Sequence, residues 1–418
     1  MKLSLNFTNV SEYKKEGTFM ATMFQTTVAV VGAGSAGISI AARLVRKAPS
    51  LKDKVVIIDP SDKHYYQPLW TLVGGGAADV EDSVRDQETL IPEGVKWLKE
   101  SAEKFLPEKN TVMTKEGTRV LYEYLVVATG VEIYWDKIKG LKETIGKNGV
   151  CSNYSYQYVQ STWENIRNFN GGTAIFTQPS TQVKCGGAPQ KIMYLADDYF
   201  RQSGVRDNTK IIFASGLPNI FAVKRYADTL EKVIERKGIE TKYRVDLVEI
   251  DGNRKKAAFQ HLDTNETFTL NYDMIHVTPP MGPHEFIAKS PIADQDGWVD
   301  VDQYTLRHKK YKNIFGAGDC TNLPTSKTGA AIRKQAPVVV ENLLALMNGK
   351  EMRAKYDGYT SCPLVTGYNK LVLAEFDYNK NPQESFPIDQ SKERMSMYLM
   401  KKNLLPIMYW NGMLKGLM

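Results

Sequence analysis

The chain has 418 residues, of which 42% are hydrophobic and 24% are charged, so it is long enough for more than one domain and too apolar for global disorder. Its formal net charge is only +7, and no lysine- and arginine-rich block is interleaved with aromatic residues, so we expect no nucleic-acid partner. The four cysteines are scattered, form no C-x-x-C pair and have no histidine cluster beside them, which argues against a secreted disulfide scaffold and predicts no metal site.

Residues 1–24 have neither the apolar core of a secretory signal nor the arginines of a mitochondrial transit peptide. We therefore expect them to form a flexible leader. No apolar run in the chain reaches the roughly 18 residues that a helix needs to cross a bilayer. The sequence thus predicts a soluble or peripheral membrane protein.

A strand–helix–strand unit with a dinucleotide-binding fingerprint follows the leader. The β-branched run 26–31 predicts a buried parallel strand, 38–45 an apolar helix and 55–58 a second strand. The intervening turn has the spacing G-x-G-x-x-G, and Asp59 ends the second strand, where its carboxylate can accept hydrogen bonds from ribose hydroxyls. The unit predicts dinucleotide binding, because the glycine spacing stands in the strand–helix context that it requires.

The three glycines of this turn are each expected to have a separate role. Gly32 permits the tight turn, Gly34 lets the backbone approach a pyrophosphate, and Gly37 lets the helix pack closely on the strand. The pyrophosphate is expected at the helix N-terminus, where unpaired N–H groups and the helix dipole favour an anion.

Two later segments indicate which dinucleotide binds. Residues 124–130 read as a strand ending in Ala-Thr-Gly, and residues 313–320 read as a strand ending in Gly-Asp. Together with the glycine turn, they resemble the FAD-binding framework of the flavin disulfide-reductase superfamily. The resemblance implies that FAD is the cofactor and that Thr129, Gly130 and Asp319 contact it, with Asp319 on the ribitol chain.

The predicted fold class is α/β with two Rossmann-like domains, because the resemblance implies an FAD domain in two pieces with a second domain inserted between them. A C-terminal amphipathic helical segment is expected to follow. The expected boundaries are 25–165 and 295–375 for the FAD domain, 166–294 for the inserted domain and 376–418 for the C-terminal segment.

The inserted domain repeats the α/β alternation but lacks a second glycine motif. Strands are predicted at 172–178 and 210–214, and an amphipathic helix at 222–237. The first strand leads into 179–189, where proline and bulky residues replace the glycines that let a backbone approach a pyrophosphate. We therefore expect that electrons do not come from NAD(P)H, and Cys185 is the conspicuous residue of the replacing segment.

Cys185 has the sequence surroundings of a reactive thiol. It follows Lys184 and precedes a helix that is predicted to begin near Pro189. A neighbouring cation and a helix N-terminus both stabilise the thiolate form of a cysteine.

Three runs of sequence carry a closer resemblance: 183–195, 315–328 and 356–368, the last of which contains Tyr-Thr-Ser-Cys-Pro-Leu-Val-Thr-Gly-Tyr. They resemble the sulfide:quinone oxidoreductases, particularly the mitochondrial-type branch and its bacterial relatives, and the resemblance extends over nearly the whole chain. It implies that Cys185 and Cys362 form a redox-active disulfide beside the flavin. It also implies FAD contacts at Ser35, Ala36, Asp59, Gln67, Ala102, Asp319 and Lys327.

The other two cysteines are not part of this implied disulfide. Cys320 is expected to pack as part of the wall of the FAD site. Cys151 lies in a segment, 150–154, that resembles the place where bacterial-type members keep a third cysteine, so it is a further candidate catalytic residue. It could relay sulfur, tether the flavin or simply pack.

The resemblance implies a mechanism in which sulfide attacks one sulfur of the Cys185–Cys362 disulfide and leaves a persulfide on one cysteine and a thiolate on the other. The electrons then reduce FAD and pass to a membrane quinone, while a small acceptor removes the sulfur. An alternative in the same superfamily is an NADH:quinone oxidoreductase. An alternative of another class is a non-catalytic, redox-sensing flavoprotein.

The tail, residues 391–418, holds five lysines and arginines against one glutamate, and six of the fifteen methionines. Its apolar spacing predicts a pair of amphipathic helices broken near Pro406. One reading is a helix that covers the core; the other is a monotopic membrane segment with Tyr409 and Trp410 at headgroup level. A lipid-soluble quinone favours the second reading, so we expect a peripheral enzyme on the cytoplasmic face of a bacterial membrane. The mitochondrial inner membrane is the alternative compartment, and a homodimer is a further option.

Overall fold

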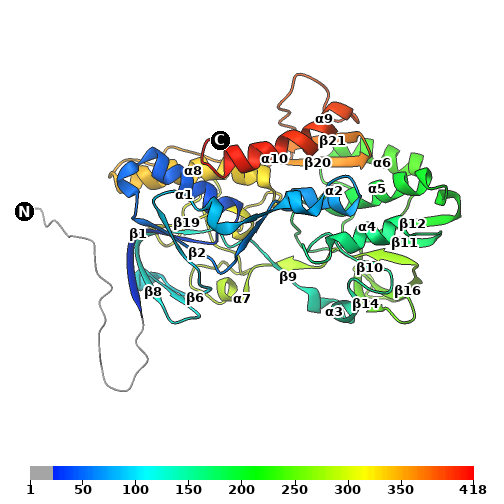
Figure 1. The fold of residues 1–418 in the computed structure, drawn as a ribbon, viewed down its shortest axis with the longest axis horizontal. Coiled ribbons are helices and arrows are strands. Elements are labelled where there is room, and N and C mark those ends of the chain that lie inside the picture. The colour runs from blue at the N-terminus through cyan, green and yellow to red at the C-terminus, as the bar shows by residue number, and fades with distance from the viewer. Residues whose placement is uncertain (1–21) are drawn as a thin grey trace, which may run out of the picture.

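The computed structural model describes residues 22–418, which form two lobes with a C-terminal helical run lying across both (Figure 1). Most of the predicted leader, residues 1–24, lies outside the described residues. Met23 and Phe24, the last two residues of the predicted leader, are instead part of the first sheet, where they pair with Arg119 and Val120.

The first lobe is built on a sheet with the strand order β5-β2-β1-β8-β7-β6, in which β19 also pairs with β8. The strands β5, β2, β1, β8 and β19 run parallel, and β7 and β6 extend the sheet antiparallel. Figure 1 shows two helices, α1 and α8, along one face of this sheet. The bounds are β1 (Met23–Val31), β2 (Val55–Ile58), β5 (Val95–Leu98), β6 (Ala102–Leu106), β7 (Thr111–Thr114), β8 (Arg119–Val127), β19 (Ile314–Gly316), α1 (Ser35–Lys47) and α8 (Gly329–Met347).

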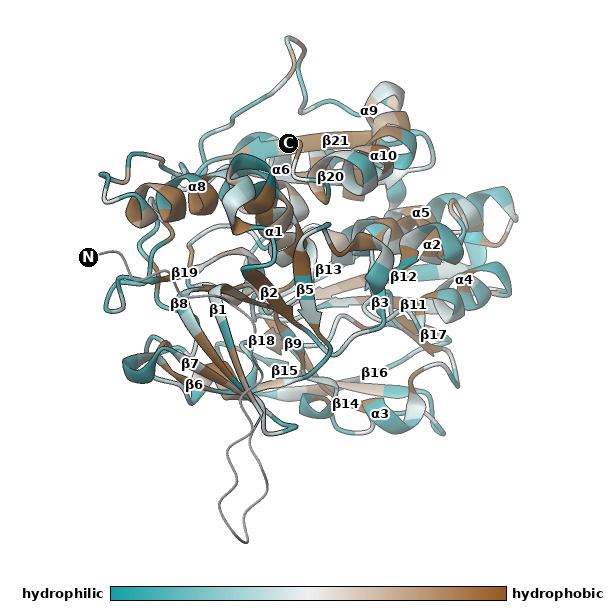
Figure 2. Ribbon diagram, turned by 60° about the vertical axis from the view of Figure 1, so that its left-hand side comes forward, coloured by the Kyte–Doolittle hydropathy of each residue, from teal (hydrophilic) through white to brown (hydrophobic). Residues whose placement is uncertain are grey.

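The central strands of this sheet are covered on both faces, as parallel strands usually are. Every residue of β2 is buried, and so are the last six residues of β1. The hydropathy colouring in Figure 2 shows much of these strands in brown, the colour of hydrophobic residues. The strand–helix–strand unit predicted from the sequence is therefore confirmed, with Asp59 directly after β2.

The second lobe is built on a parallel sheet with the order β10-β17-β11-β12-β13. A three-stranded antiparallel sheet, β14-β15-β16, lies beside it. The bounds are β10 (Val150–Cys151), β11 (Gly172–Gln178), β12 (Thr209–Ser215), β13 (Glu240–Tyr243), β14 (Val245–Asp251), β15 (Lys256–His261), β16 (Thr267–Asn271), β17 (Met274–His276), α4 (Val159–Arg167), α5 (Ala188–Gln202) and α6 (Lys224–Lys237).

Two predicted domain boundaries are wrong in detail. Residues 150–165 were assigned to the FAD domain, but β10 pairs with β17 and so belongs to the second sheet. Residues 360–375 were assigned there too, and residue 376 to the C-terminal segment. They form the hairpin β20 (Thr360–Gly367) and β21 (Lys370–Phe376), whose apolar side chains complete the core beneath α5. The hairpin therefore connects the two lobes.

Short strands and helices connect the two lobes and lie at their edges. They are β3 (Lys63–Tyr65), β4 (Val84–Asp86), β9 (Glu132–Ile133), β18 (Met281–Gly282), α2 (Trp70–Gly74), α3 (Leu141–Thr144) and α7 (Glu285–Ala288).

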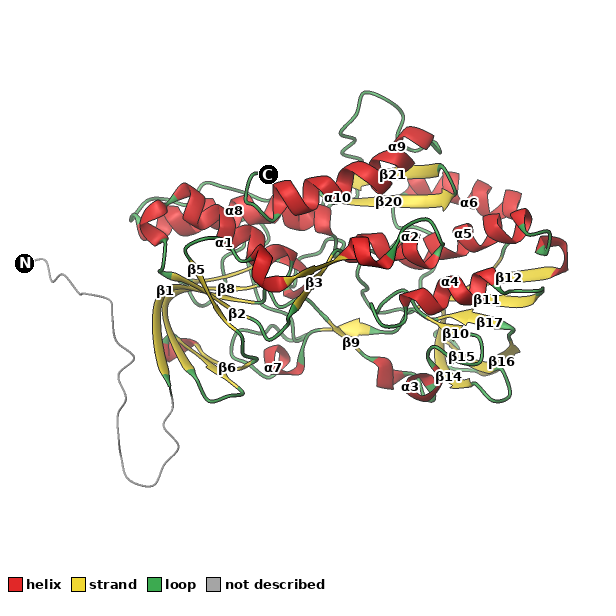
Figure 3. Cartoon of the chain, viewed as in Figure 1, coloured by secondary structure: helices red, strands yellow, loops and turns green. Residues whose placement is uncertain are grey.

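The C-terminal segment forms one helical run from Met395 to Met413, not the predicted pair broken near Pro406. It consists of α9 (Met395–Leu399) and α10 (Leu405–Met408), each followed by a π-helical turn. Pro406 lies in the first turn of α10, between the two π-helical turns, where its missing N–H is tolerated. Figure 3 shows the run extending from the second lobe to the first. Within residues 22–418, no helix is long and apolar enough to cross a membrane.

Candidate functional site: a glycine turn and a pair of cysteines

The glycine turn between β1 and α1 has the geometry of a pyrophosphate-binding loop. Gly32 has φ +104°, and a Cβ there would lie 2.4 Å from the carbonyl oxygen of Ala128, the residue after β8. A Cβ on Gly37 would lie 1.8 Å from the carbonyl oxygen of Gly32. A Cβ on Gly34, in contrast, would meet no protein atom within 4 Å. Two glycines are thus needed for the protein's own packing, whereas Gly34 faces open space.

The N-terminus of α1, which begins with Ser35 and Ala36, has no side-chain cap. The first N–H groups of a helix have no partner within the helix, so this end offers donors and a positive dipole to an anion. Open space beside uncapped N–H groups fits the pyrophosphate of FAD.

Asp59 lies beside this turn at the end of β2. Its carboxylate accepts hydrogen bonds from the backbone N–H of Ala33 at 2.7 Å and of Ser61 at 2.8 Å. Burial raises the pKa of Asp59, and these two N–H donors oppose that change. Each carboxylate oxygen has a second lone pair, so Asp59 can still accept from a ribose hydroxyl, the role predicted from the sequence.

The matched substitutions Gly37→Ala and Gly34→Ala separate folding from cofactor binding. We expect Gly37→Ala to lower the free energy of unfolding by about 3 kcal/mol or more, because the new methyl overlaps backbone that cannot move freely. We expect Gly34→Ala to leave the melting temperature of the apoprotein close to wild type but to weaken FAD binding about tenfold or more, because the methyl enters the pyrophosphate space. Thermal unfolding and FAD titration measure the two effects; equal FAD affinity in Gly34→Ala and wild type would contradict this placement.

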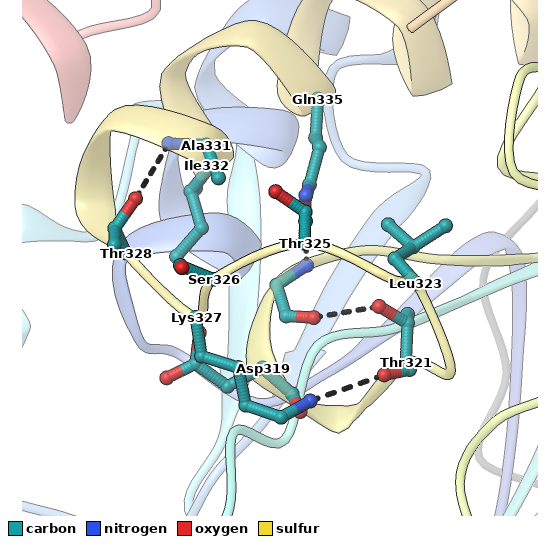
Figure 4. Close-up of a pocket in the computed structure, with 11 residues that line it drawn as sticks. Asp319, Thr321, Leu323, Thr325, Ser326, Lys327, Thr328, Ala331, Ile332 and Gln335 are labelled. Carbon is teal, nitrogen blue, oxygen red and sulfur yellow. Dashed lines mark hydrogen bonds between the residues drawn. The ribbon is translucent and has the colours of Figure 1, made fainter. Parts of the chain in front are cut away.

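Asp319 and Lys327 lie in the segment of chain between β19 and α8 (Figure 4). Lys327 is almost fully buried and its Nζ donates to the carbonyl oxygens of Asp319 at 2.6 Å and Thr321 at 3.2 Å. The same ammonium lies 3.8 Å from the centre of the Trp298 ring. Burial lowers the pKa of Lys327 and raises that of Asp319, and each opposes the change in the other. The cavity that they line, about 10 Å³ in volume, holds no more than a water molecule.

The remaining predicted FAD contacts lie in three places. Thr129 and Gly130 lie in the loop that begins at Ala128 after β8, which pairs with β1. Gln67 lies in the loop after β3, and its Oε1 accepts from Lys184 Nζ at 3.2 Å. Ala102 begins β6 at the antiparallel end of the sheet, and its methyl side chain can offer a cofactor only an apolar contact.

The fold brings Cys185 and Cys362 together, although 177 positions separate them in the sequence. Cys185 lies in the loop between β11 and α5, where its N–H donates to the carbonyl oxygen of Lys327 at 2.8 Å. Cys362 is the third residue of β20, which packs on α5. The two thiols are close enough to form a hydrogen bond. Cys185 has φ +55°, a strained conformation for a residue other than glycine and one that is concentrated at functional sites.

The two thiols have opposite electrostatic character. The pKa of Cys185 is held well below its ordinary value by the hydrogen bond from Cys362 and by the ammonium of Lys191, whose Nζ lies 3.1 Å from its sulfur. The pKa of Cys362 is raised well above its ordinary value, because it donates that bond and because it is buried. Cys185 is therefore the thiolate of the reduced pair.

A second cation reaches this site from the C-terminal helix. Lys401 is only 4% exposed, and its Nζ donates to the carbonyl oxygen of Pro68 at 3.0 Å. Burial and the charge of Lys191 lower its pKa to about 7, while the two cysteines oppose that change. Neither lysine was identified from the sequence. Lys191 is six positions beyond Cys185 on α5, whereas no spacing signal points to Lys401.

Cys151 and Cys320 are placed differently. Cys151 is fully buried in the core of the second lobe, where its sulfur lies 3.6 Å from the carbonyl oxygen of Ile275. Burial raises its pKa to about 12. Cys320 is buried in the short helical turn 318–320 that follows β19, with its sulfur 3.4 Å from the carbonyl oxygen of Val127. Within residues 22–418, no charged group shifts the pKa of Cys151. Burial raises the pKa of Cys320, and the nearby charge of Lys327 opposes that change.

A larger cavity, about 390 Å³, lies elsewhere. Gly149, Gly171 and Asp273, which line it, precede β10, β11 and β17, so it opens at the amino ends of the second sheet. Ligands of open α/β sheets bind at the carboxyl ends of the strands, which is where Cys185 lies. The candidate site is therefore the cysteine pair and not the larger cavity.

Residues 26–164 match the pyridine nucleotide-disulphide oxidoreductase family. The chain is 51% identical over 393 residues to a protein of Dictyostelium discoideum named sulfide:quinone oxidoreductase, mitochondrial, covering 94% of this chain and 86% of that protein. It is 47% identical over 390 residues to the Mus musculus protein of the same name, covering 93% and 86%. The chain belongs to the sulfide:quinone oxidoreductase family. The family is FAD-dependent, so the chain is a flavoprotein, as predicted.

The solved structure of the sulfide:quinone oxidoreductase from Aquifex aeolicus has the same fold. It superposes with a TM-score of 0.80 at 20% identity, covering 94% of this chain and 92% of that chain. The two-lobed α/β architecture predicted from the sequence is therefore confirmed for this sulfide:quinone oxidoreductase family member.

Proposed function

We propose that Cys185 and Cys362 form the redox-active disulfide through which this enzyme passes electrons from sulfide, by way of FAD, to a quinone. The observation that carries the proposal is the contact of these two thiols at the carboxyl edge of the second sheet, with Lys191 beside Cys185. Sulfide oxidation with quinone reduction is the activity for which the family is named.

The thiol electrostatics favour one direction of attack. A disulfide opens fastest when the departing sulfur has the lower pKa. Since Lys191 stabilises Cys185 as a thiolate, HS⁻ attacks the sulfur of Cys362, the Cys185–Cys362 bond breaks, and Cys185 leaves as the thiolate. Cys362 then holds a persulfide. One S–S bond forms and one breaks, and the negative charge passes from HS⁻ to Cys185.

A small acceptor with a nucleophilic sulfur removes the outer sulfur of this persulfide and leaves Cys362 as a thiol. Re-forming the disulfide then releases two electrons and one proton. FAD, when bound, would accept such electron pairs and pass them on to a quinone. Lys327, held beside Asp319, is placed to balance negative charge near the cofactor.

The direct test is whether the oxidised protein contains this disulfide. We expect a digest made without reductant, after free thiols are blocked, to yield a peptide in which Cys185 is linked to Cys362. Cys151 and Cys320 are expected as blocked thiols in the same digest, because their sulfurs lie against backbone carbonyl oxygens. Detection of Cys151 in the linked peptide would instead support the third-cysteine role left open by the sequence; we propose a packing role for it.

An NADH:quinone oxidoreductase is the less favoured candidate. The segment after β11 carries Cys185 where a nicotinamide-binding domain has its glycine turn. The backbone of that segment could not closely approach the pyrophosphate of NADH.

The C-terminal helix offers a surface for a membrane. We define the apolar tail patch as the exposed side chains Met395, Leu399, Leu404 and Ile407, which are between 40% and 58% exposed. Exposed apolar side chains along a helix with lysines nearby are typical of a segment that lies in a lipid interface. The predicted anchors Tyr409 and Trp410 do not take part, because they are buried against the first lobe. We propose that the patch places the enzyme on a membrane that contains the quinone.

Charged residues in the apolar tail patch are expected to weaken vesicle binding. In Leu399→Asp/Ile407→Asp, each aspartate would carry a charge into the lipid interface, and we expect vesicle affinity to fall about tenfold or more. Flavin reduction by sulfide is expected to stay within about twofold of wild type. Tyr304→Asp is the matched control, because Tyr304 is an exposed apolar residue outside the tail. Sedimentation with anionic vesicles measures binding; equal sedimentation of the tail variant and the control would contradict the proposal.

The mitochondrial names of the relatives favour the mitochondrial inner membrane as the compartment. The preference for the cytoplasmic face of a bacterial membrane has no support from them. A homodimer stays a prediction.

A further inference from the structure

Tyr409 of the C-terminal helix reaches the phosphate-binding turn. Its hydroxyl lies 2.7 Å from Ser35 Oγ and 2.5 Å from His64 Nε2, and its side chain is buried. Ser35 is the first residue of α1, directly after Gly34. A residue of the tail is thus one hydrogen bond away from the helix end at which we place the pyrophosphate.

The carbonyl oxygen of Ala33, which can only accept, determines the direction of the hydrogen bonds that join His64, Tyr409 and Ser35. The Nδ1 of His64 lies 3.1 Å from the carbonyl oxygen of Ala33, which can only accept, so Nδ1 carries the hydrogen. Burial lowers the pKa of His64 to about 4, so its ring is neutral near pH 7 and Nε2 is an acceptor. Tyr409 therefore donates to His64, and the hydroxyl of Ser35 donates to Tyr409.

These hydrogen bonds hold both sides of the glycine turn. His64 holds the carbonyl group of Ala33, to which the side-chain amide of Gln87 also donates at 2.9 Å. Tyr409 holds the side chain of Ser35 at the start of α1. Gly34, the residue between Ala33 and Ser35, is the one that faces open space.

The ring of Tyr409 is itself held in place. Its centre lies 4.5 Å from that of Tyr66, and the neighbouring Trp410 lies under the guanidinium of Arg85 at 5.0 Å. A Cβ on Gly416 would lie 2.7 Å from the backbone nitrogen of Arg43 on α1, so the end of the chain packs directly on that helix. The hydroxyl is therefore presented by a packed segment.

We propose that Tyr409 is a positioning residue that holds the glycine turn in its FAD-binding conformation, so that docking of the C-terminal helix contributes to retention of the cofactor. The inference rests on FAD binding at the glycine turn and does not depend on sulfide as the substrate. The tail then has two separable roles: the apolar tail patch faces outward, and Tyr409 faces the turn.

The test compares FAD release from full-length Tyr409→Phe and Tyr398→Phe holoenzymes. Both variants lose the hydroxyl of a buried tyrosine in the same helical run, but the Tyr398 hydroxyl makes no hydrogen bond within residues 22–418. We expect Tyr409→Phe to raise the dissociation constant for FAD about fivefold to 100-fold, because two hydrogen bonds are lost. Tyr398→Phe is expected to change it less than twofold. Turnover per bound FAD is expected to be equal in the two variants.

Ser35→Ala supplies a second route, because it removes the other partner of the same hydrogen bond. We expect the double variant Ser35→Ala/Tyr409→Phe to bind FAD more tightly than the product of the two single losses would give, because the two residues act through one contact. Additive losses, or equal FAD affinity in Tyr409→Phe and Tyr398→Phe, would overturn the proposal. Loss of sulfide turnover with unchanged FAD affinity would bear on the cysteine chemistry and would also overturn this role for Tyr409.

Discussion

Replacing either Cys185 or Cys362 by serine is expected to lower sulfide-driven flavin reduction by about 1000-fold or more. Each substitution removes one sulfur of the pair that sulfide must open, and loss of the reacting atom costs far more than loss of a supporting contact. FAD content is expected to stay at the level of wild type, because neither thiol supports the glycine turn. Anaerobic stopped-flow absorbance of the purified variants measures the rate, and the spectrum before mixing gives the FAD content.

Cys151→Ser is the matched control for these two variants. A serine hydroxyl can donate to the carbonyl oxygen of Ile275, as the thiol of Cys151 does, so the core should be preserved. We expect its rate to stay within about threefold of wild type, the margin expected when no reacting atom is lost. A loss as large as that of Cys185→Ser would show that the disulfide pair is not sufficient for the chemistry.

Lys191→Met is expected to raise the pKa of Cys185, because the substitution removes an opposite charge in contact with its sulfur. Because the pKa of Cys185 lies below its ordinary value in the presence of Lys191, the thiolate is then lost at a higher pH than before. The rate of alkylation of Cys185 by iodoacetamide, measured at pH 6 to 7 in the reduced holoenzyme by mass spectrometry, is therefore expected to fall about tenfold or more.

Lys401→Met is expected to have a smaller effect in the same direction, confined to the pH range below about 7, where Lys401 is protonated. Its neighbour Lys402 is the control, because it lies on the same helix and is more exposed. Alkylation profiles that are identical in Lys191→Met, Lys402→Met and wild type would mean that the thiolate of Cys185 is stabilised by something other than Lys191.

The sequence was sufficient for local features whose signals lie within a few residues. The glycine spacing, β11 at 172–178 and the start of α5 near Pro189 are examples, because a strand or helix start depends on adjacent residues. The pairing of Cys185 with Cys362 came only from the resemblance to a family. No local pattern shows that the β20–β21 hairpin packs on the second lobe.

The tail was the least predictable part for the same reason. Pro406 indicated a break, but the π-helical turns on either side keep the helix continuous. Tyr409 and Lys401 have ordinary sequence surroundings, and their contacts with Ser35 and Pro68 are made across more than three hundred positions. Tertiary packing, which depends on the whole fold, decides both roles.

The most direct test of the central claim is anaerobic absorbance spectroscopy of the full-length holoenzyme, with sulfide added first and a short-chain quinone second. We expect sulfide to bleach the flavin band and the quinone to restore it, while NADH in a parallel sample leaves the band unchanged. If NADH bleaches the flavin and sulfide does not, the segment that carries Cys185 binds a nicotinamide after all, and the assignment of Cys185 and Cys362 as the electron entry site is wrong.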